Sequence, residues 1–243
     1  ITPSIRQVYK MKEKILGVIG GLGPETGCKF CLNVNRKFKS LTKRQPHILL
    51  DNLPISQEAE ERLINGGPSQ EHLDLLLDSV QRLNKLDADL IVIACNTVHI
   101  FIDKLREKST VPILSIIEET AKKCKDMNLS KVGILGSTKT IQSRLHSNEL
   151  NKWNIESITP DEFDQQFVCE CIIRIINNTI KEDDKKRMIE IIENLAKEGA
   201  RGVILGCTEL PLLISDQNAN IPIINTIQIL EDSSVNNLIN KIK

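Results

Sequence analysis

Two cysteines occupy equivalent places in two similar stretches of the sequence. Cys95 follows the apolar run Leu90–Ala94 and precedes a second apolar stretch, Val98–Leu105. Cys207 follows the apolar run Val203–Gly206. Each cysteine is therefore predicted to lie between the end of a buried strand and the start of a helical turn. At such a position, free backbone N–H groups and the positive end of the helix dipole favour an anion, either a thiolate or a bound carboxylate.

Such a pair of cysteines is suited to proton transfer at a carbon atom. One thiolate can remove a Cα proton from one face of an amino acid while the opposing thiol returns a proton to the other face. Lowering a thiol pKa from ~8.5 to ~7 requires ~2 kcal/mol. A helix terminus supplies ~0.3–1 kcal/mol, or up to ~2 kcal/mol in a favourable buried geometry, and burial opposes it. At best, therefore, we expect one thiolate and one thiol.

A single cysteine at the end of an apolar run is more typical of a hydrophobic core than of an active site. Two cysteines at equivalent positions of a duplicated pattern, each followed by Thr or Asn, favour a functional role for Cys95 and Cys207.

The chain repeats a long pattern once. Three pairs of segments recur in the same order at nearly one spacing, which indicates two similar domains, since solenoid repeats are much shorter. The pairs are Lys14–Gly20 with Lys131–Gly136, Ala88–Thr97 with Ala200–Glu209, and Val111–Ser115 with Ile221–Asn225.

Helical patterns lie between these strands. One helix is expected to begin at Gly23-Pro24-Glu25-Thr26, and others are expected over residues 69–86, 163–176 and 183–196. Alternating strands and helices predict an α/β fold with two similar doubly wound parallel sheets. In such folds ligands bind beyond the carboxyl ends of the strands, where both cysteines are expected.

The proline-containing strands that begin at Pro112 and Pro222 suggest where the chain passes between domains. We expect a first domain of residues 11–111 plus 222–243, a second domain of residues 112–221, and an N-terminal extension of residues 1–10. A simple division near residue 112 is the alternative.

The composition narrows the class of protein. Thirty-two basic and 32 acidic residues give a formal net charge of zero, so nothing indicates a nucleic acid or an anionic membrane as partner. No apolar run approaches the ~20 residues that span a bilayer, and no signal-peptide pattern is visible. Seven irregularly spaced cysteines do not indicate a disulfide scaffold. We expect a cytoplasmic protein.

Several motifs together resemble the aspartate/glutamate racemase family, most closely its aspartate-racemase branch. The resemblance covers nearly the whole chain. The motifs are Gly20-Gly21-Leu22-Gly23-Pro24, Cys95-Asn96-Thr97-Val98-His99, Pro112-Ile113-Leu114-Ser115 with Glu118-Glu119-Thr120, and Gly206-Cys207-Thr208-Glu209.

This resemblance implies two domains related by a pseudo-twofold axis, an active site in the cleft between them, a homodimer, and racemisation without pyridoxal phosphate or metal. It implies that Cys95 and Cys207 are the two bases, and that Asn96, Thr97 and Thr208 hold the α-carboxylate and the amino group. Further candidate substrate contacts are Gly21, Asn52 at the end of the second strand, and Glu209.

Aspartate is the substrate that we expect from the resemblance. In the aspartate racemases that this chain resembles, an arginine shortly after the second strand is expected to bind the distal carboxylate. The corresponding segment here, Asp51–Glu60, contains no basic residue. Arg62 or Arg44 would have to bind the distal carboxylate, or the substrate has a neutral side chain.

Other residues and functions are less well supported. Cys28 and Cys31 have the spacing of one of the two ligand pairs of a zinc site, but no second pair completes it, and both are expected in the core. His99 is placed either to polarise Cys95 or to pack. The alternatives are a sister reaction, such as that of a hydantoin racemase or a maleate-type isomerase, a non-catalytic small-molecule binding protein, and a redox protein with a Cys95–Cys207 disulfide.

Overall fold

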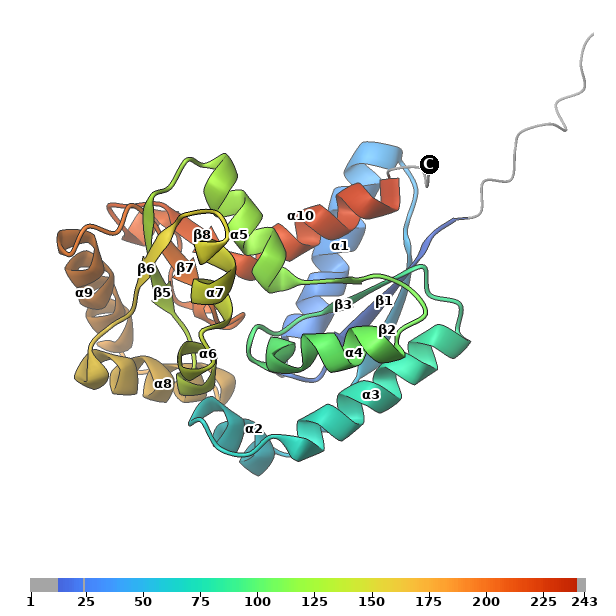
Figure 1. Ribbon diagram of the computed structural model, residues 1–243, viewed down its shortest axis with the longest axis horizontal. Coiled ribbons are helices and arrows are strands. Elements are labelled where there is room, and N and C mark those ends of the chain that lie inside the picture. The colour runs from blue at the N-terminus through green and yellow to red at the C-terminus, as the bar shows by residue number, and fades with distance from the viewer. Residues whose placement is uncertain (1–12, 24, 240–243) are drawn as a thin grey trace, which may run out of the picture.

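The computed structural model describes residues 13–23 and 25–239, and the expected N-terminal extension lies outside them. The chain forms two four-stranded parallel sheets flanked by helices (Figure 1). The first sheet has the order β2-β1-β3-β4 and the second has the order β6-β5-β7-β8, so the second repeats the first. The strands are β1 Ile15–Gly20, β2 His47–Asn52, β3 Leu90–Ile93, β4 Ile113–Leu114, β5 Lys131–Leu135, β6 Glu156–Ile158, β7 Val203–Leu205 and β8 Ile223–Asn225. The expected α/β fold with two similar parallel sheets is confirmed.

The helices that connect these strands agree with the hydrophobic periodicity of the sequence. Helices α3, α8 and α9 begin and end within one residue of the bounds expected from the pattern. The helices are α1 Thr26–Thr42, α2 Gln57–Ile64, α3 Gln70–Lys85, α4 Ile102–Lys108, α5 Ile116–Asp126, α6 Thr138–Gln142, α7 Leu145–Asn151, α8 Glu162–Ile176, α9 Asp184–Lys197 and α10 Thr226–Ile239.

Short polar side chains fix where several helices begin. Ser56, Ser115, Ser137 and Asp161 each accept a hydrogen bond from the backbone N–H three residues later, which satisfies one of the free donors of the first helical turn. Because Ser115 and Ser137 follow strand ends directly or closely, these caps turn the chain sharply at the carboxyl edge of the sheets.

The sheets end slightly later than the expected domain boundaries. Strand β4 pairs with β3 and strand β8 pairs with β7, so each belongs to the sheet that precedes it in the chain. The carbonyl of Pro112 accepts from the amide of Ile91, and the carbonyl of Pro222 accepts from the amide of Val203. Each proline therefore starts a strand without needing an N–H group, and the chain leaves each sheet after that strand.

Helices α5 and α10 follow β4 and β8 and lie side by side (Figure 1). The side chain of Ser233 on α10 donates to Glu119 on α5. Both helices pack on both halves of the molecule, because one set of their apolar side chains joins the core of the first sheet and another set joins the core of the second. The first set includes Ile116, Ile117, Leu230 and Val235, and the second includes Ala121, Cys124 and Ile229.

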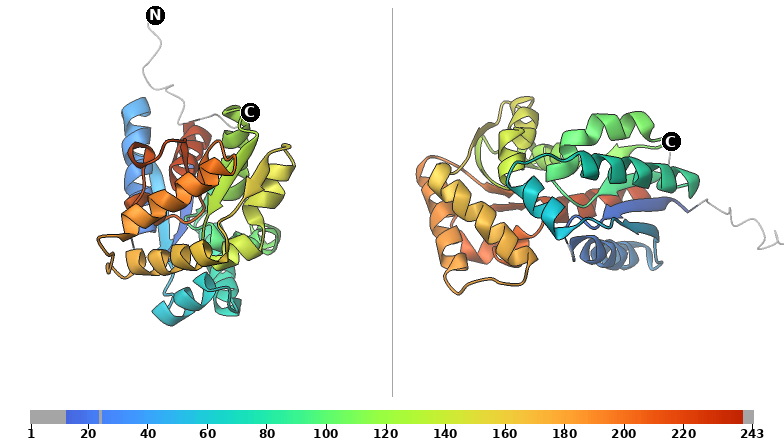
Figure 2. Two further views of the ribbon diagram at one scale, coloured as in Figure 1. Left: turned by 90° about the vertical axis from the view of Figure 1, so that its left-hand side faces the viewer. Right: turned by 90° about the horizontal axis from the view of Figure 1, so that it is seen from below.

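Helix α2 belongs to the first half in sequence but packs against the second. Ile64 joins the buried cluster around Val168 and Cys169 of α8. Figure 2, viewed from below, shows α2 lying between the two halves. The side chains of Gln57 and Glu61 form hydrogen bonds with Asn177, at the end of α8, with lengths of 3.2 Å each.

No helix in the described part of the chain combines the length and the apolar character that crossing a membrane requires.

We predict that Gly21→Ala destabilises the protein much more than Gly199→Ala. Both glycines have a positive φ, +78° and +99° respectively, so alanine costs about 1–2 kcal/mol at either position. A Cβ at Gly21 would also overlap the backbone of Leu53, whereas the nearest atom to a Cβ at Gly199 is a flexible Lys131 side-chain carbon at 3.7 Å. We expect Gly21→Ala to lower the free energy of unfolding by more than about 3 kcal/mol in urea denaturation. Equal losses for the two variants would contradict this packing at Gly21.

Candidate functional site

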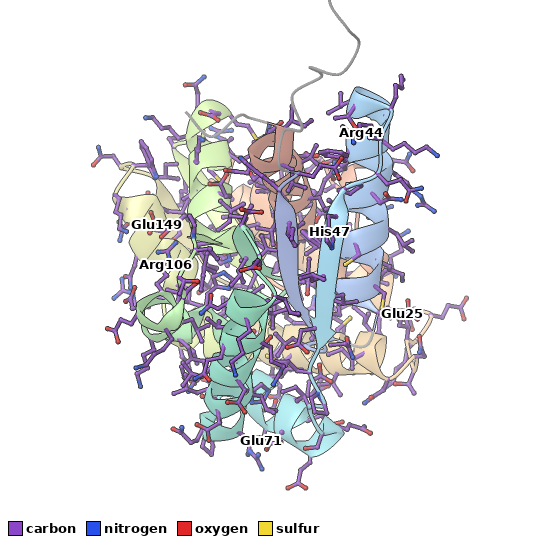
Figure 3. The ribbon with its side chains drawn as sticks, turned by 90° about the vertical axis from the view of Figure 1, so that its right-hand side faces the viewer. Glu25, Arg44, His47, Glu71, Arg106 and Glu149 are labelled. Atoms are coloured by element: carbon purple, nitrogen blue, oxygen red, sulfur yellow. The ribbon has the colours of Figure 1, made fainter. Side chains whose placement is uncertain are left out.

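The two cysteines lie at matching positions of the two sheets. Cys95 is two residues beyond the end of β3, and Cys207 is two residues beyond the end of β7. Both strands occupy interior positions of their sheets. The carboxyl ends of the strands form one edge of the first sheet. In Figure 3, Glu25 lies toward this edge, to which β2 points, whereas His47 begins β2 nearer the opposite end. The prediction that both cysteines follow strand ends is confirmed.

Cys207 is buried and forms a hydrogen bond with a carboxylate. Its thiol donates to Oε2 of Glu209 at 3.1 Å. Burial, followed by the charge of Glu209, raises the pKa of Cys207 well above its usual value. The ionisation of Cys95 acts in the same direction, so the two thiols are near enough to influence one another.

Burial raises the pKa of Cys95 to about 12. The backbone N–H groups of Val98 and Thr97 act against this change, as expected for a thiol at the start of a helical turn. The negative charges of Glu209 and Glu60 reinforce it. The free N–H groups predicted from sequence are therefore present, and the expected opposing effect of burial, reinforced by two carboxylates, outweighs them.

Glu209 connects the two halves of the molecule at this edge. Its Oε1 accepts from the hydroxyl of Thr26 at 2.7 Å, and its Oε2 accepts from the hydroxyl of Thr208 at 3.0 Å as well as from Cys207. The carboxylate lies directly against Gly23, where any Cβ would overlap it. The glycine in this motif therefore leaves room for a side chain from the other half.

Asn96 is buried and bonded on both sides of its amide. Its Nδ2 donates to the hydroxyl of Thr226 at 3.0 Å, and its Oδ1 lies 3.1 Å from Nε2 of His146. Burial lowers the pKa of His146 to about 3, so this imidazole is neutral and its Nε2–H is the donor to Asn96. The hydroxyl of Thr226 in turn donates to the carbonyl of Leu205 at the end of β7.

Three hydroxyl groups form a third connection between the halves. The hydroxyl of Thr97 lies 3.0 Å from that of Ser137 and 3.0 Å from that of Thr140, and these two are 3.0 Å apart. Thr97 follows β3 of the first sheet, whereas Ser137 and Thr140 belong to the start of α6. Sequence reasoning missed Ser137, Thr140, His146 and Thr226, because each acquires its role only when the two halves meet.

His99 does not face the Cys95 thiol. Its Nε2 accepts from the backbone N–H of Ile116, so Nδ1 carries the proton and donates to the carbonyl of Cys95 at 2.7 Å. Burial lowers the pKa of His99 to about 4. This neutral imidazole holds the backbone at Cys95 and the start of α5 together, so the idea that it polarises the thiol is not supported by the geometry.

Glu60 is a further acidic group at the site that sequence reasoning did not select. It lies on α2 and is half-buried. Burial, followed by the charges of Glu209 and Glu61, raises its pKa to about 7. Among the described residues, no side chain forms a hydrogen bond or an ion pair with the Glu60 carboxyl group.

The two arginines considered as partners for a distal carboxylate are bonded elsewhere. Arg62 pairs with Glu58 at 3.6 Å and with Glu71 at 3.4 Å. Arg44 pairs with Glu13, and Figure 3 shows it near His47, at the end of the first sheet away from Glu25.

Gly21 and Asn52 are the remaining candidate substrate contacts. Gly21 turns the chain after β1 against the backbone of Leu53, and Asn52 is exposed at the end of β2 beside Gly20. Their contact with a substrate stays a prediction.

The cysteines outside the site were only partly placed by the sequence. Cys169 and Cys171 are buried in α8 as expected, and Cys31 on α1 is half-buried and packs against the core of the first sheet. Cys28 is exposed, so the expectation that it belongs to the core is wrong. Within residues 13–23 and 25–239, no group of three or more His, Cys, Asp or Glu side chains is arranged to hold a metal ion.

Known proteins share both the sequence and the fold. The broad specificity amino-acid racemase RacX of Bacillus subtilis is 26% identical over 226 residues, which cover 91% of this chain and 96% of RacX. The crystal structure of a candidate Asp/Glu racemase from Yersinia pestis is 28% identical, with a TM-score of 0.83 over 93% of this chain and 100% of that one. The aspartate racemase of Picrophilus torridus is 25% identical, with a TM-score of 0.74 over 95% of this chain and 96% of that one.

A family model gives the same assignment over most of the chain. Residues 19–231 match the model described as Asp/Glu/Hydantoin racemase, and this range includes both cysteines and Glu209. The duplicated sheets, the paired thiols at their ends and this match together place the chain in the Asp/Glu/Hydantoin racemase family.

Proposed function

We propose that the chain is an amino-acid racemase that uses Cys95 and Cys207 as its two proton-transfer groups, without pyridoxal phosphate or a metal. The observation that supports this most strongly is the equivalence of the two thiols: each lies two residues beyond an interior strand, and ionisation of one affects the other. Racemisation has two directions that are nearly mirror images, so two similar groups on opposite sides of Cα suit it. A homodimer and a cytoplasmic location, both expected from sequence, stay predictions.

In this mechanism one cysteine acts as the thiolate and the other as the thiol. The thiolate takes the Cα proton from one face, and the opposing thiol gives its proton to the other face, which leaves the enantiomer and exchanges the roles of the two cysteines. The thiolate is costly to form, because burial and nearby carboxylates raise the pKa of both thiols. The α-ammonium group of a substrate bound beside Glu209 would favour it, since a nearby cation stabilises the charged form of a thiol.

Backbone and hydroxyl groups at the same edge are suited to the substrate α-carboxylate. The N–H groups of Thr97 and Val98 face Cys95. The hydroxyl of Thr208 donates to Glu209, so it would reach the substrate carboxylate only by turning its O–H away from that group. These donors would also stabilise the negative charge that accumulates as the proton leaves. Asn96 and the Thr97 hydroxyl form hydrogen bonds with protein groups, so we assign them first to positioning the loop that follows β3. Their contact with substrate is part of the proposal.

The two cysteines also bear on the alternative functions. Several of the sister reactions that the resemblance suggests need only one of the two cysteines. The presence of both therefore favours racemisation. Both thiols are free in the structure, as are the other cysteines of the described chain. The names of the relatives state different substrates, since one is a broad specificity amino-acid racemase and another an aspartate racemase. Aspartate therefore stays an expectation from the resemblance.

We expect Cys95→Ser and Cys207→Ser each to lower kcat for racemisation by about 10²–10⁴-fold, the usual contribution of a positioned acid or base. Each variant retains one thiol, so one of them is expected still to exchange the Cα proton of a single enantiomer. Racemisation is followed by circular dichroism and exchange by NMR in D₂O, with a panel of L- and D-amino acids and no added cofactor.

The matched control is Cys28→Ser, because this thiol is exposed on α1. Racemisation at the normal rate by either site variant would rule out the two-base mechanism. Activity that depends on added pyridoxal phosphate or metal would also contradict the proposal.

We expect Glu209→Gln to lower the pKa of both thiols. The carboxylate raises the pKa of Cys95 and of Cys207, so removing its charge favours the thiolates. Alkylation by iodoacetamide requires the thiolate, so its rate at a fixed pH near 8 should increase, and its pH profile should move to lower pH.

Mass spectrometry of the alkylated peptides distinguishes Cys95 from the other cysteines. Glu25→Gln is the control, because Glu25 is exposed beside the site and pairs with Lys29. An unchanged alkylation profile in Glu209→Gln would show that the carboxylate does not set the thiol pKa.

A further inference from the structure

Hydrogen-bond acceptors without donors gather where α2 meets α8. The carboxyl group of Glu60 is half-buried and has no partner among the described residues. On α8, the side-chain amide of Gln165 donates from Nε2 to the carbonyl of Gly136 at 2.9 Å, which fixes its orientation. Its Oε1 is buried and accepts no hydrogen bond. A buried acceptor without a donor is costly, so both groups favour a ligand that donates.

These two acceptors belong to the same packed junction beside the thiols. Glu60 precedes Ile64 by four residues and Gln165 precedes Cys169 by four residues, so each shares a helix face with a member of one buried cluster. Gly136, to which Gln165 is bonded, follows β5 at the carboxyl edge of the second sheet. The charge of Glu60 raises the pKa of Cys95, so its carboxyl group is near enough to influence that thiol.

The charged groups that shift the pKa of Glu60 are of one sign. The charged groups that act on Glu60 are the carboxylates of Glu209 and Glu61. Arg62, on the same helix, is paired with Glu58 and Glu71. A distal carboxylate of a substrate would meet repulsion here, whereas a distal cation would form a charge-assisted hydrogen bond.

Building on the racemase function proposed above, we infer that the substrate is an amino acid with a cationic side chain, a primary ammonium or a guanidinium group, and that Glu60 binds this distal cation. The carbonyl oxygen of Gln165 accepts a second hydrogen bond from it. Glu60 is then the residue that determines specificity, and the thiols act on Cα as before.

The test compares L-lysine with L-norleucine, which has the same chain length but lacks the distal charge, and with L-aspartate. Cα-proton exchange in D₂O gives kcat/KM for each, and ligand-observed saturation-transfer NMR measures binding independently of chemistry. Wild type is expected to prefer lysine to both others. Glu60→Gln is expected to lower the lysine-to-norleucine ratio of kcat/KM by about tenfold or more, and to weaken lysine binding, since one hydrogen bond to a charged group is lost.

Glu61→Gln is the matched control, because Glu61 is the next residue on α2 but bonds outward to Gln57 and Asn177. It is expected not to lower the ratio, because removing the charge of Glu61 lowers the pKa of Glu60 and favours its carboxylate form. The Glu60 carboxyl group has no hydrogen-bond or ion-pair partner within residues 13–23 and 25–239, so its replacement by Gln is not expected to impair folding, which a thermal melt checks.

The outcomes separate the two proposals. Equal losses for lysine and norleucine in Glu60→Gln would place Glu60 at the α-ammonium group and overturn the inference. A preference for aspartate, or an unchanged lysine-to-norleucine ratio, would also overturn it. In each of these cases, exchange itself would uphold the racemase proposal. No exchange with any amino acid, together with lysine binding that depends on Glu60, would overturn the racemase proposal and retain the cation site. Absence of both exchange and binding would overturn both.

Discussion

Burying the carboxylate of Glu209 requires donors from both halves of the molecule, because a charge removed from water without partners is strongly destabilising. Thr26 donates from the first half, whereas Thr208 and Cys207 donate from the second. The turn at Gly23 has to be free of a side chain for the carboxylate to lie there. The relative placement of the two sheets, the ionisation of both thiols and the shape of the glycine turn therefore all depend on this one group.

The other connections between the halves near the site are uncharged. Asn96 bonds to Thr226 and to a neutral His146, and the Thr97 hydroxyl bonds to those at the start of α6. Neutral bonds hold the two strand ends together without adding a cation beside the thiols. Burial is the main cause of the raised thiol pKa values, and the carboxylates of Glu209 and Glu60 add to it. A bound cation would offset the charge of these carboxylates.

The sequence contained enough information for the sheets and the thiols, but not for the surroundings of the thiols. Repeated apolar runs predicted the strands, and the position of Cys95 and Cys207 after them followed directly, because the carboxyl ends of parallel strands share an edge. Glu60 could not be selected this way, since α2 is an ordinary amphipathic helix whose placement depends on packing against the second half. His99 has the spacing to reach the thiol, yet a competing backbone donor at Ile116 fixes its ring elsewhere.

The return of the chain to its starting half has a consequence for how the protein is made. The core beside β1 contains Leu16 and Phe30 from the beginning of the chain together with Leu230 and Val235 from α10. During synthesis the N-terminal sheet therefore leaves the ribosome with one face uncovered, while the second sheet can complete most of its core from contiguous residues. Exposed apolar surface of this kind invites aggregation or chaperone binding. Helix α10, which follows β8 in the chain, closes the core beside β1, so the first sheet is completed only after the strands of the second sheet have been synthesised.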